Sequence, residues 1–227
     1  MKIFIIASAL SLVGSCATER YTDKIQKIKD NIEFSDENQI NTYANSITAD
    51  ELIKDVYLFS SDELQGRKTG EPGYNKASTY VKDFYMSMGI PSPLGDDYYQ
   101  HISDSFFYNP MKSSQNVVAY IKGSEFPEEV LIISAHLDHL GTKDENIYNG
   151  ADDNGSGTAA LLEIAEAFKL AESNGIGPKR SIMFLHFTGE EQSLEGSRYY
   201  VTHPIFPLDK TIANLNIDMI GRSDPIK

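Results

Sequence analysis

The residues of this chain that could do chemistry are carboxylates and histidines gathered in four short segments. These are His136-Leu137-Asp138-His139, the run Gly150–Gly157 with its two aspartates, the pair Glu190-Glu191, and Asp218. Carboxylate oxygens combined with a single imidazole for each ion suit a pair of zinc ions that share a carboxylate. The residue types therefore predict such a site, provided that the fold brings the four segments together.

Each segment also has a simpler explanation when it is taken alone. His136 and Asp138 could be a surface pair, and the two glutamates could favour a helix N-terminus. The run Gly150–Gly157 is not a phosphate-binding loop of the Walker type, because no Gly-Lys-[Ser/Thr] follows it. It is not an EF-hand, because Gly150 and Leu161 stand where Asp and Glu are needed. Only the whole set, in this order, is specific.

Strands that alternate with helices must position these segments. Apolar, β-branched runs predict strands at 117–122, 130–135, 181–187 and 211–217. Helical spacing predicts helices at 74–88, 158–169 and 194–201, and a capping box at Thr48–Glu51 begins another that extends to Leu64. The alternation predicts an α/β sheet with both faces covered. In open α/β sheets, ligands bind at the carboxyl ends of the strands, where His136, Glu190 and Asp218 follow.

Composition limits the possible partners and ligands. The chain has 227 residues, 41% of them hydrophobic, which is enough for one sizeable core. Its 33 acidic and 20 basic residues give a net charge of −13, which argues against nucleic acid and anionic membrane surfaces as partners. One cysteine excludes an internal disulfide framework and a thiolate-cluster metal site. Any bound metal must be held by histidine and carboxylate.

The N-terminus has the pattern of an export signal. Lys2 precedes an apolar run, Ile3–Val13, that is too short to span a bilayer. The following Gly14-Ser15-Cys16 completes a sequence that resembles the lipobox of bacterial lipoproteins. This predicts a signal peptide at 1–15, a lipid anchor at Cys16, a polar spacer at 16–47, and a location in the bacterial cell envelope facing the periplasm or exterior. The alternative is a buried strand with an incidental cysteine.

From Leu52 onward the sequence resembles peptidase family 28 of the metallopeptidases, which includes co-catalytic zinc aminopeptidases, glutamate carboxypeptidase II and glutaminyl cyclases. The matching segments are 64–73, 116–119, 134–138, 150–157, 189–191 and 216–221. The resemblance implies a zinc-exopeptidase catalytic domain at 48–227. The implied fold is a three-layer sandwich with a mixed, largely parallel central sheet flanked by helices, incomplete at its C-terminus.

The resemblance also implies a role for each metal ligand. His136 and Asp218 match ligands of one zinc ion, Asp152 matches the bridging carboxylate, and Glu191 matches a ligand of the second zinc ion. The peptide between Asp152 and Asp153 is expected to be cis.

Two further residues acquire catalytic roles from the same resemblance. Glu190 matches the general base, and Asp138 matches the carboxylate behind His136 that fixes the imidazole tautomer. The nucleophile is expected to be a hydroxide that bridges the two metal ions.

One ligand of the family pattern has no counterpart in the sequence. The second zinc ion takes a final histidine well downstream of the Asp218-type ligand, and the chain stops at Lys227. The sequence is therefore interpreted as the N-terminal portion of a longer protein. Among the other histidines, His139 is the candidate replacement near the site, whereas His101, His186 and His203 are poor ones.

The resulting hypothesis is a zinc-dependent exopeptidase that acts on peptides outside the cytoplasm, most simply an aminopeptidase. One alternative is a glutaminyl-cyclase-like acyltransferase that uses one zinc ion. The other is a catalytically silent binding domain of the same fold, which is disfavoured because every metal position that can be present is filled.

Overall fold

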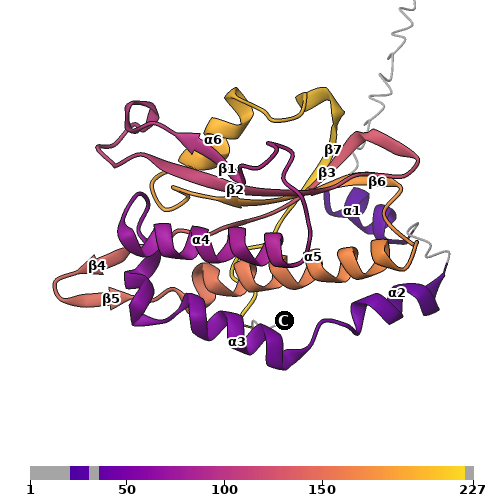
Figure 1. Cartoon of the computed structure of the whole chain (residues 1–227), viewed down its shortest axis with the longest axis horizontal. Helices are drawn as coiled ribbons and strands as arrows, with labels where there is room; N and C mark the ends of the chain where they lie inside the picture. The colour runs from indigo at the N-terminus through magenta and orange to yellow at the C-terminus, as the bar shows by residue number, and fades with distance from the viewer. Residues whose placement is uncertain (1–20, 31–35, 223–227) are drawn as a thin grey trace, which may run out of the picture. The chain divides into compact units, whose positions relative to one another are not determined.

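The computed structural model describes residues 21–30 and 36–222 (Figure 1). The predicted signal peptide and Cys16 lie outside these residues. The chain divides into two compact units, residues 1–38 and 39–227. In the first unit, α1 spans Tyr21–Asp30. Within the described ranges, each helix is too short or too polar to cross a bilayer.

A five-stranded sheet runs through the second unit in the order β1-β2-β6-β3-β7 (Figure 1). The strands are β1 (Tyr99–Ile102), β2 (Ser114–Ile121), β3 (Phe126–His136), β6 (Arg180–Phe187) and β7 (Thr211–Asn216). β3 is parallel to both β6 and β7, whereas β2 is antiparallel to β1 and β6. The sheet is therefore mixed, and the carboxyl ends of its three parallel strands meet at one edge.

Helices cover both faces of this sheet, which confirms the predicted α/β sandwich. The helices α3 (Ala49–Phe59), α4 (Pro72–Ser87) and α5 (Gly157–Ser173) lie on one side, and α6 (Glu195–Thr202) lies on the other (Figure 1). In β2, β3 and β6, alternate residues enter two separate cores. Val117 and Ala119 pack with the α4 and α5 side, and Val118 packs with Tyr200 of α6. Burial on both faces explains why these strands are continuously apolar.

The chain connections create a crevice at the edge where the parallel strands end. From β3 the chain passes through α5 to β6 on one side of β3, and from β6 through α6 to β7 on the other side. The two crossover helices lie on opposite faces of the sheet, so the loops after the adjacent strands β3 and β6 diverge (Figure 1). Such a switch point is where open α/β sheets bind ligands.

Several elements differ from the sequence predictions. The helix that begins after Thr48 has the predicted cap, with the Thr48 hydroxyl accepting from the Glu51 amide at 3.3 Å. It ends at Phe59 instead of Leu64, because residues 62–67 form a separate 3₁₀ turn, η1, in which Gln65 and Gly66 are left-handed. The region 16–47, predicted as a polar spacer, contains α1 and also α2 (Glu37–Ala44). β1, and the hairpin of β4 (Gly141–Lys143) with β5 (Asn146–Tyr148), were not predicted.

The packing of α3 against α5 makes the stability of the fold depend on pH. Glu163 of α5 is buried, and the pKa of its carboxyl is raised to about 7, first by desolvation and then by Glu51, Glu166 and Asp55. A raised folded-state pKa favours the protonated form. This contribution to stability is full below the unfolded pKa near 4.5 and is lost as pH rises through about 7.

Replacing Glu163 by glutamine is therefore expected to stabilise the protein at pH 8 and to have little effect at pH 5. We expect the free energy of unfolding to rise by about 1 kcal/mol at pH 8. This is less than the full pKa shift implies, because water screens the charges of Glu163 and its acidic neighbours. Thermal unfolding across this pH range measures the effect, and the exposed Glu128→Gln serves as the control. An equal effect at both pH values would contradict the assignment to Glu163.

Candidate metal centre

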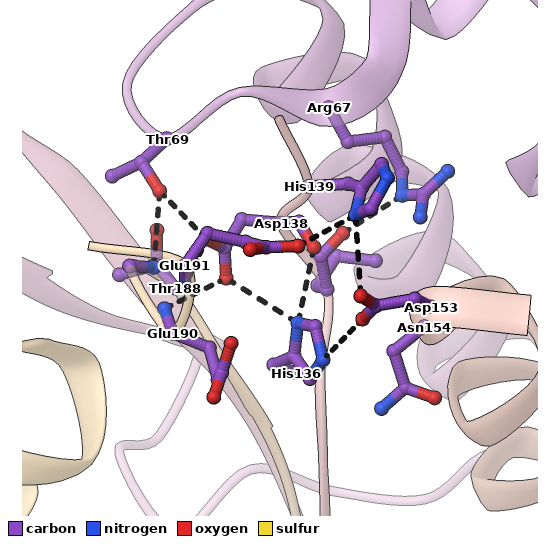
Figure 2. A network of polar contacts seen from close by, with 12 residues as sticks. Arg67, Thr69, His136, Asp138, His139, Asp153, Asn154, Thr188, Glu190 and Glu191 are labelled. Atoms are coloured by element: carbon purple, nitrogen blue, oxygen red, sulfur yellow. Dashed lines mark hydrogen bonds and ion pairs between the residues drawn. The ribbon is translucent and has the colours of Figure 1, made fainter. Parts of the chain in front are cut away.

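His136, the last residue of β3, faces two carboxylates from other parts of the chain. Its Nε2 lies 3.1 Å from Asp153 Oδ1 (Figure 2) and 3.3 Å from Asp218 Oδ1. Asp153 lies in η3 (Ala151–Ser156), the turn that leads into α5, and Asp218 follows β7. The three groups form one cluster with the spacing of metal ligands. His136 and Asp218 are brought together as predicted.

The protonation of His136 favours a cation at this cluster. Its Nδ1 lies 3.1 Å from the Asp138 carbonyl oxygen, which can only accept, so the proton belongs on Nδ1. In the neutral imidazole, Nε2 is then the acceptor nitrogen; it is buried and makes no hydrogen bond. An acceptor nitrogen facing two carboxylates leaves all lone pairs unmatched, and a metal ion resolves this arrangement.

A second cluster lies beside the first and shares Asp153 with it. His139 Nδ1 lies 2.6 Å from Glu191 Oε1 and 3.9 Å from Asp153 Oδ2. His139, Asp153 and Glu191 together have the spacing of metal ligands. Gly150, with φ of +59°, leaves room for the His139 ring, since a Cβ there would lie 2.6 Å from it. Desolvation lowers the pKa of His139, while desolvation and then Asp153 raise that of Glu191.

The position of the shared carboxylate corrects the sequence prediction. Asp153 directs one oxygen to each histidine, whereas Asp152, expected as the bridging residue, points the other way. Asp152 Oδ1 accepts from the Gly221 amide at 2.9 Å, and Oδ2 lies 3.7 Å from Arg222 Nε. The backbone of η3 is not regularly helical at Asp153 and Asn154, so the two adjacent acids diverge. The cis peptide likewise joins Asp153 to Asn154, one position after the predicted one.

Asp138 lies behind the two histidines and organises the turn that carries Glu190 and Glu191. Its carboxylate accepts from the backbone amides of these residues at 3.1 and 3.4 Å (Figure 2). Burial raises its pKa to about 6, against the lowering effect of His136 and of these amides. The predicted bond from His136 to this carboxylate is not made, because Nδ1 lies 3.8 Å from Oδ1 and the backbone carbonyl is closer.

Glu190 lies in the pocket beside the first cluster. His136, Asp218 and Glu190 line this pocket together with Phe187, Leu194 and Asn216. The adjacent Glu191 contacts His139, whereas Glu190 belongs to neither ligand cluster. One glutamate of the pair thus lies in a ligand cluster and the other lines the pocket.

The other histidines lie outside both clusters. His101 Nε2 is 3.2 Å from Asp97 on the surface, and His203 stacks on Tyr199 with ring centroids 4.4 Å apart. His186 lies in β6 with Nε2 2.8 Å from the Tyr85 hydroxyl, and burial lowers its pKa to about 3. These positions agree with their rejection as ligands.

Asn154 connects the two chain segments that carry Asp153 and Asp218, and it was not singled out from the sequence. Its side-chain nitrogen donates to the Ile217 carbonyl at 2.9 Å, and its oxygen accepts from the Gly157 amide at 2.9 Å and the Met219 amide at 3.3 Å. The side chain thus holds the Asp218 segment against η3. Its place beside two aspartates in a glycine-rich run was the only sequence signal.

Comparison with known proteins places this site in context. Residues 116–227, which include every residue of both clusters, match the model described as peptidase family M28. Leupeptin-inactivating enzyme 1 of Streptomyces exfoliatus is 32% identical over 160 residues, which cover 70% of this chain and 32% of that protein. Carboxypeptidase Q of Xenopus laevis is 38% identical over 117 residues, covering 51% and 22% respectively.

Among solved structures, the LapA aminopeptidase of Legionella pneumophila is similar with a TM-score of 0.59 and 21% identity. The match covers 82% of this chain and 47% of that one, and it bears on the fold. The chain thus spans about a third or less of the length of these curated relatives.

Proposed function

Through residues 116–227 this chain belongs to peptidase family M28, and from that premise we propose that it carries the metal centre of a zinc-dependent exopeptidase, an aminopeptidase. The observation that carries the proposal is Asp153, which directs one carboxylate oxygen toward each of two histidine-containing clusters. A carboxylate shared in this way suits a pair of neighbouring zinc ions.

The proposed zinc ligands are the residues of the two clusters. His136, Asp153 and Asp218 would hold one ion, and Asp153, Glu191 and His139 would contribute to the other. When bound, zinc lowers the pKa of a coordinated water toward neutrality and polarises a carbonyl group. The buried Nε2 of His136, which makes no hydrogen bond, and the neighbouring carboxylates fit this cation.

Glu190 is the proposed general base. It lines the pocket next to His136 and Asp218 without belonging to a ligand cluster, so its carboxylate is available to a water molecule in that pocket. It would accept a proton from the attacking water and deliver that proton to the amine that leaves. Asp138 holds the backbone of Glu190 and Glu191, so that the two side chains keep separate roles.

The charge of the pocket supports cleavage at a free N-terminus. Glu190 and Asp218 line it, and the lining residues of the described part of the chain include no lysine or arginine. The buried Arg67 donates its guanidinium N–H groups to backbone carbonyls and is not a lining residue of this pocket. A substrate α-ammonium group therefore finds the carboxylate of Glu190, which is not a proposed zinc ligand, whereas a C-terminal carboxylate would find no cationic side chain among these lining residues.

The proposal extends to location. Lys2, the apolar run Ile3–Val13 and the lipobox-like sequence at Cys16 support export and a lipid anchor in the bacterial cell envelope, with peptides outside the cytoplasm as substrates.

The test is hydrolysis of one tripeptide in three forms by the full-length protein that contains these residues. We expect cleavage of the free and C-amidated forms, no cleavage of the N-acetylated form, loss of activity on chelation, and recovery with zinc. Cleavage of only the N-acetylated form would indicate a carboxypeptidase. Pyroglutamate formation from an N-terminal glutamine would indicate a cyclase, and zinc binding without any reaction would indicate a silent domain.

A further inference from the structure

A buried arginine lies behind the candidate metal centre without reaching it. Arg67, which is 1% exposed, follows the left-handed residues Gln65 and Gly66 at the end of η1. Its Nε donates to the Leu137 carbonyl at 2.8 Å, Nη1 donates to the Asn149 and Phe59 carbonyls, and Nη2 donates to the Gly150 carbonyl at 3.0 Å. One guanidinium thus binds the segment that follows β3 and the loop that precedes Asp153.

Thr69 makes a second connection, two residues later. It is 3% exposed, and its hydroxyl donates to Asp138 Oδ2 at 3.1 Å and accepts from the Gly189 amide at 3.0 Å (Figure 2). The backbone carbonyl of Arg67 accepts from the His139 amide at 3.1 Å. Thr69 therefore joins the segment after β3 to the turn that carries Glu190 and Glu191.

The backbone of this segment is fixed by close contact with the β4–β5 hairpin. A Cβ on Gly66 would lie within 3 Å of the backbone of Gly141 and Tyr148, and φ of Gly66 is +65°. Glycine is required on both grounds. The hairpin, η1 and the two side chains thus form a rigid support on one side of the centre.

We infer that Arg67 and Thr69 are positioning residues, which hold three of the four chain segments of the metal centre in register through their backbones and through Asp138. The inference rests on the proposed function, because the centre it supports is the proposed zinc site. Arg67 acts on the segments around His139 and Gly150, and Thr69 acts on Asp138 and Gly189.

The contacts favour positioning over general stability. Each side chain joins segments that are distant in the sequence. Apart from the contact with Phe59, every contact is made to a segment that also carries a candidate ligand. Groups behind metal ligands typically contribute 10- to 100-fold to metal affinity. The guanidinium also brings positive charge near Asp138, Asp153 and Glu191, which repel one another before a metal binds.

Thr69→Val, which keeps the shape and removes the hydroxyl, tests the inference in the full-length protein. We expect zinc affinity to fall by about 10- to 100-fold. In the zinc-free protein, we expect faster amide hydrogen exchange at Gly189, whose acceptor is lost. Thr69→Ser should restore both properties.

Ser181→Ala is the matched control, because this buried hydroxyl makes three hydrogen bonds at the opposite end of β6, to Tyr120, Gly123 and Pro127. It should speed exchange at Gly123 and leave zinc affinity unchanged. Arg67→Ala supplies a second series, in which guanidinium ion, but not tetramethylammonium, should restore zinc affinity. If Arg67→Ala does not fold, the Thr69 series decides.

Unchanged zinc affinity in Thr69→Val would overturn the inference, whether or not exchange at Gly189 changes. Failure of Thr69→Ser to restore zinc affinity would also overturn it. Weaker zinc binding in a protein that cleaves no peptide would leave the positioning role standing and remove the proposed function.

Discussion

Replacing Asp153 by asparagine is expected to remove zinc binding at both clusters, whereas Asp152→Asn leaves zinc binding nearly intact. Among the residues that the structure describes, Asp153 is the one carboxylate shared by both clusters, with its oxygens 3.1 Å from His136 Nε2 and 3.9 Å from His139 Nδ1. Asparagine offers a single neutral oxygen and cannot serve both ions. We expect zinc affinity to fall by at least about 100-fold, with peptidase activity lost in proportion.

The neighbouring aspartate provides the control within the same turn. Asp152→Asn removes the same charge one residue away, but Asp152 contacts the Gly221 amide and does not face either histidine. Competition with a chromophoric chelator measures the zinc affinity of both variants, and circular dichroism checks that each is folded. Zinc loss in Asp152→Asn with zinc retained in Asp153→Asn would return the bridging role to Asp152.

The fold was predictable where hydrophobic periodicity determines it. The strands β2, β3 and β6 and the helices α4 and α5 follow apolar runs that the core buries, and the bounds of these elements and of the largely exposed β7 lie within a few residues of the predicted ones. The end of α3 at Phe59 could not be predicted, because η1 continues the apolar spacing to Leu64 while its backbone turns left-handed. The β4–β5 hairpin is three residues on each side and mostly exposed, so it carries little pattern.

The site was predictable at the level of segments and less so at the level of side chains. Strand ends determine where His136, Glu190 and Asp218 must lie, because side chains after parallel strands share one edge. The choice between Asp152 and Asp153 depends on an irregular turn, which sequence spacing does not encode. Thr69 contacts Asp138 and Gly189, which lie 69 and 120 positions further along the chain, and no local sequence pattern indicates such partners.

The largest effect on catalysis is expected from Glu190→Gln, which separates the two adjacent glutamates by role. Glu191 is 2.6 Å from His139 and belongs to a ligand cluster, whereas Glu190 lines the pocket beside His136 and Asp218. Glutamine has the size of glutamate but cannot accept a proton from water. Removing a general base typically costs 10²- to 10⁴-fold in rate, so we expect kcat to fall by about this factor while zinc content stays unchanged.

Comparing variants of both glutamates tests their separate roles more sharply than either variant alone. Glu191→Gln should lower zinc affinity, and added zinc should recover part of its activity, whereas excess zinc should not rescue Glu190→Gln. Glu145→Gln, in the turn between β4 and β5, removes an exposed acid outside the site and should leave kcat unchanged. Zinc content by atomic absorption and single-turnover hydrolysis of the same tripeptide give both readouts. If Glu190→Gln hydrolysed the peptide at the wild-type rate, another group would have to carry the proton from water to the leaving amine.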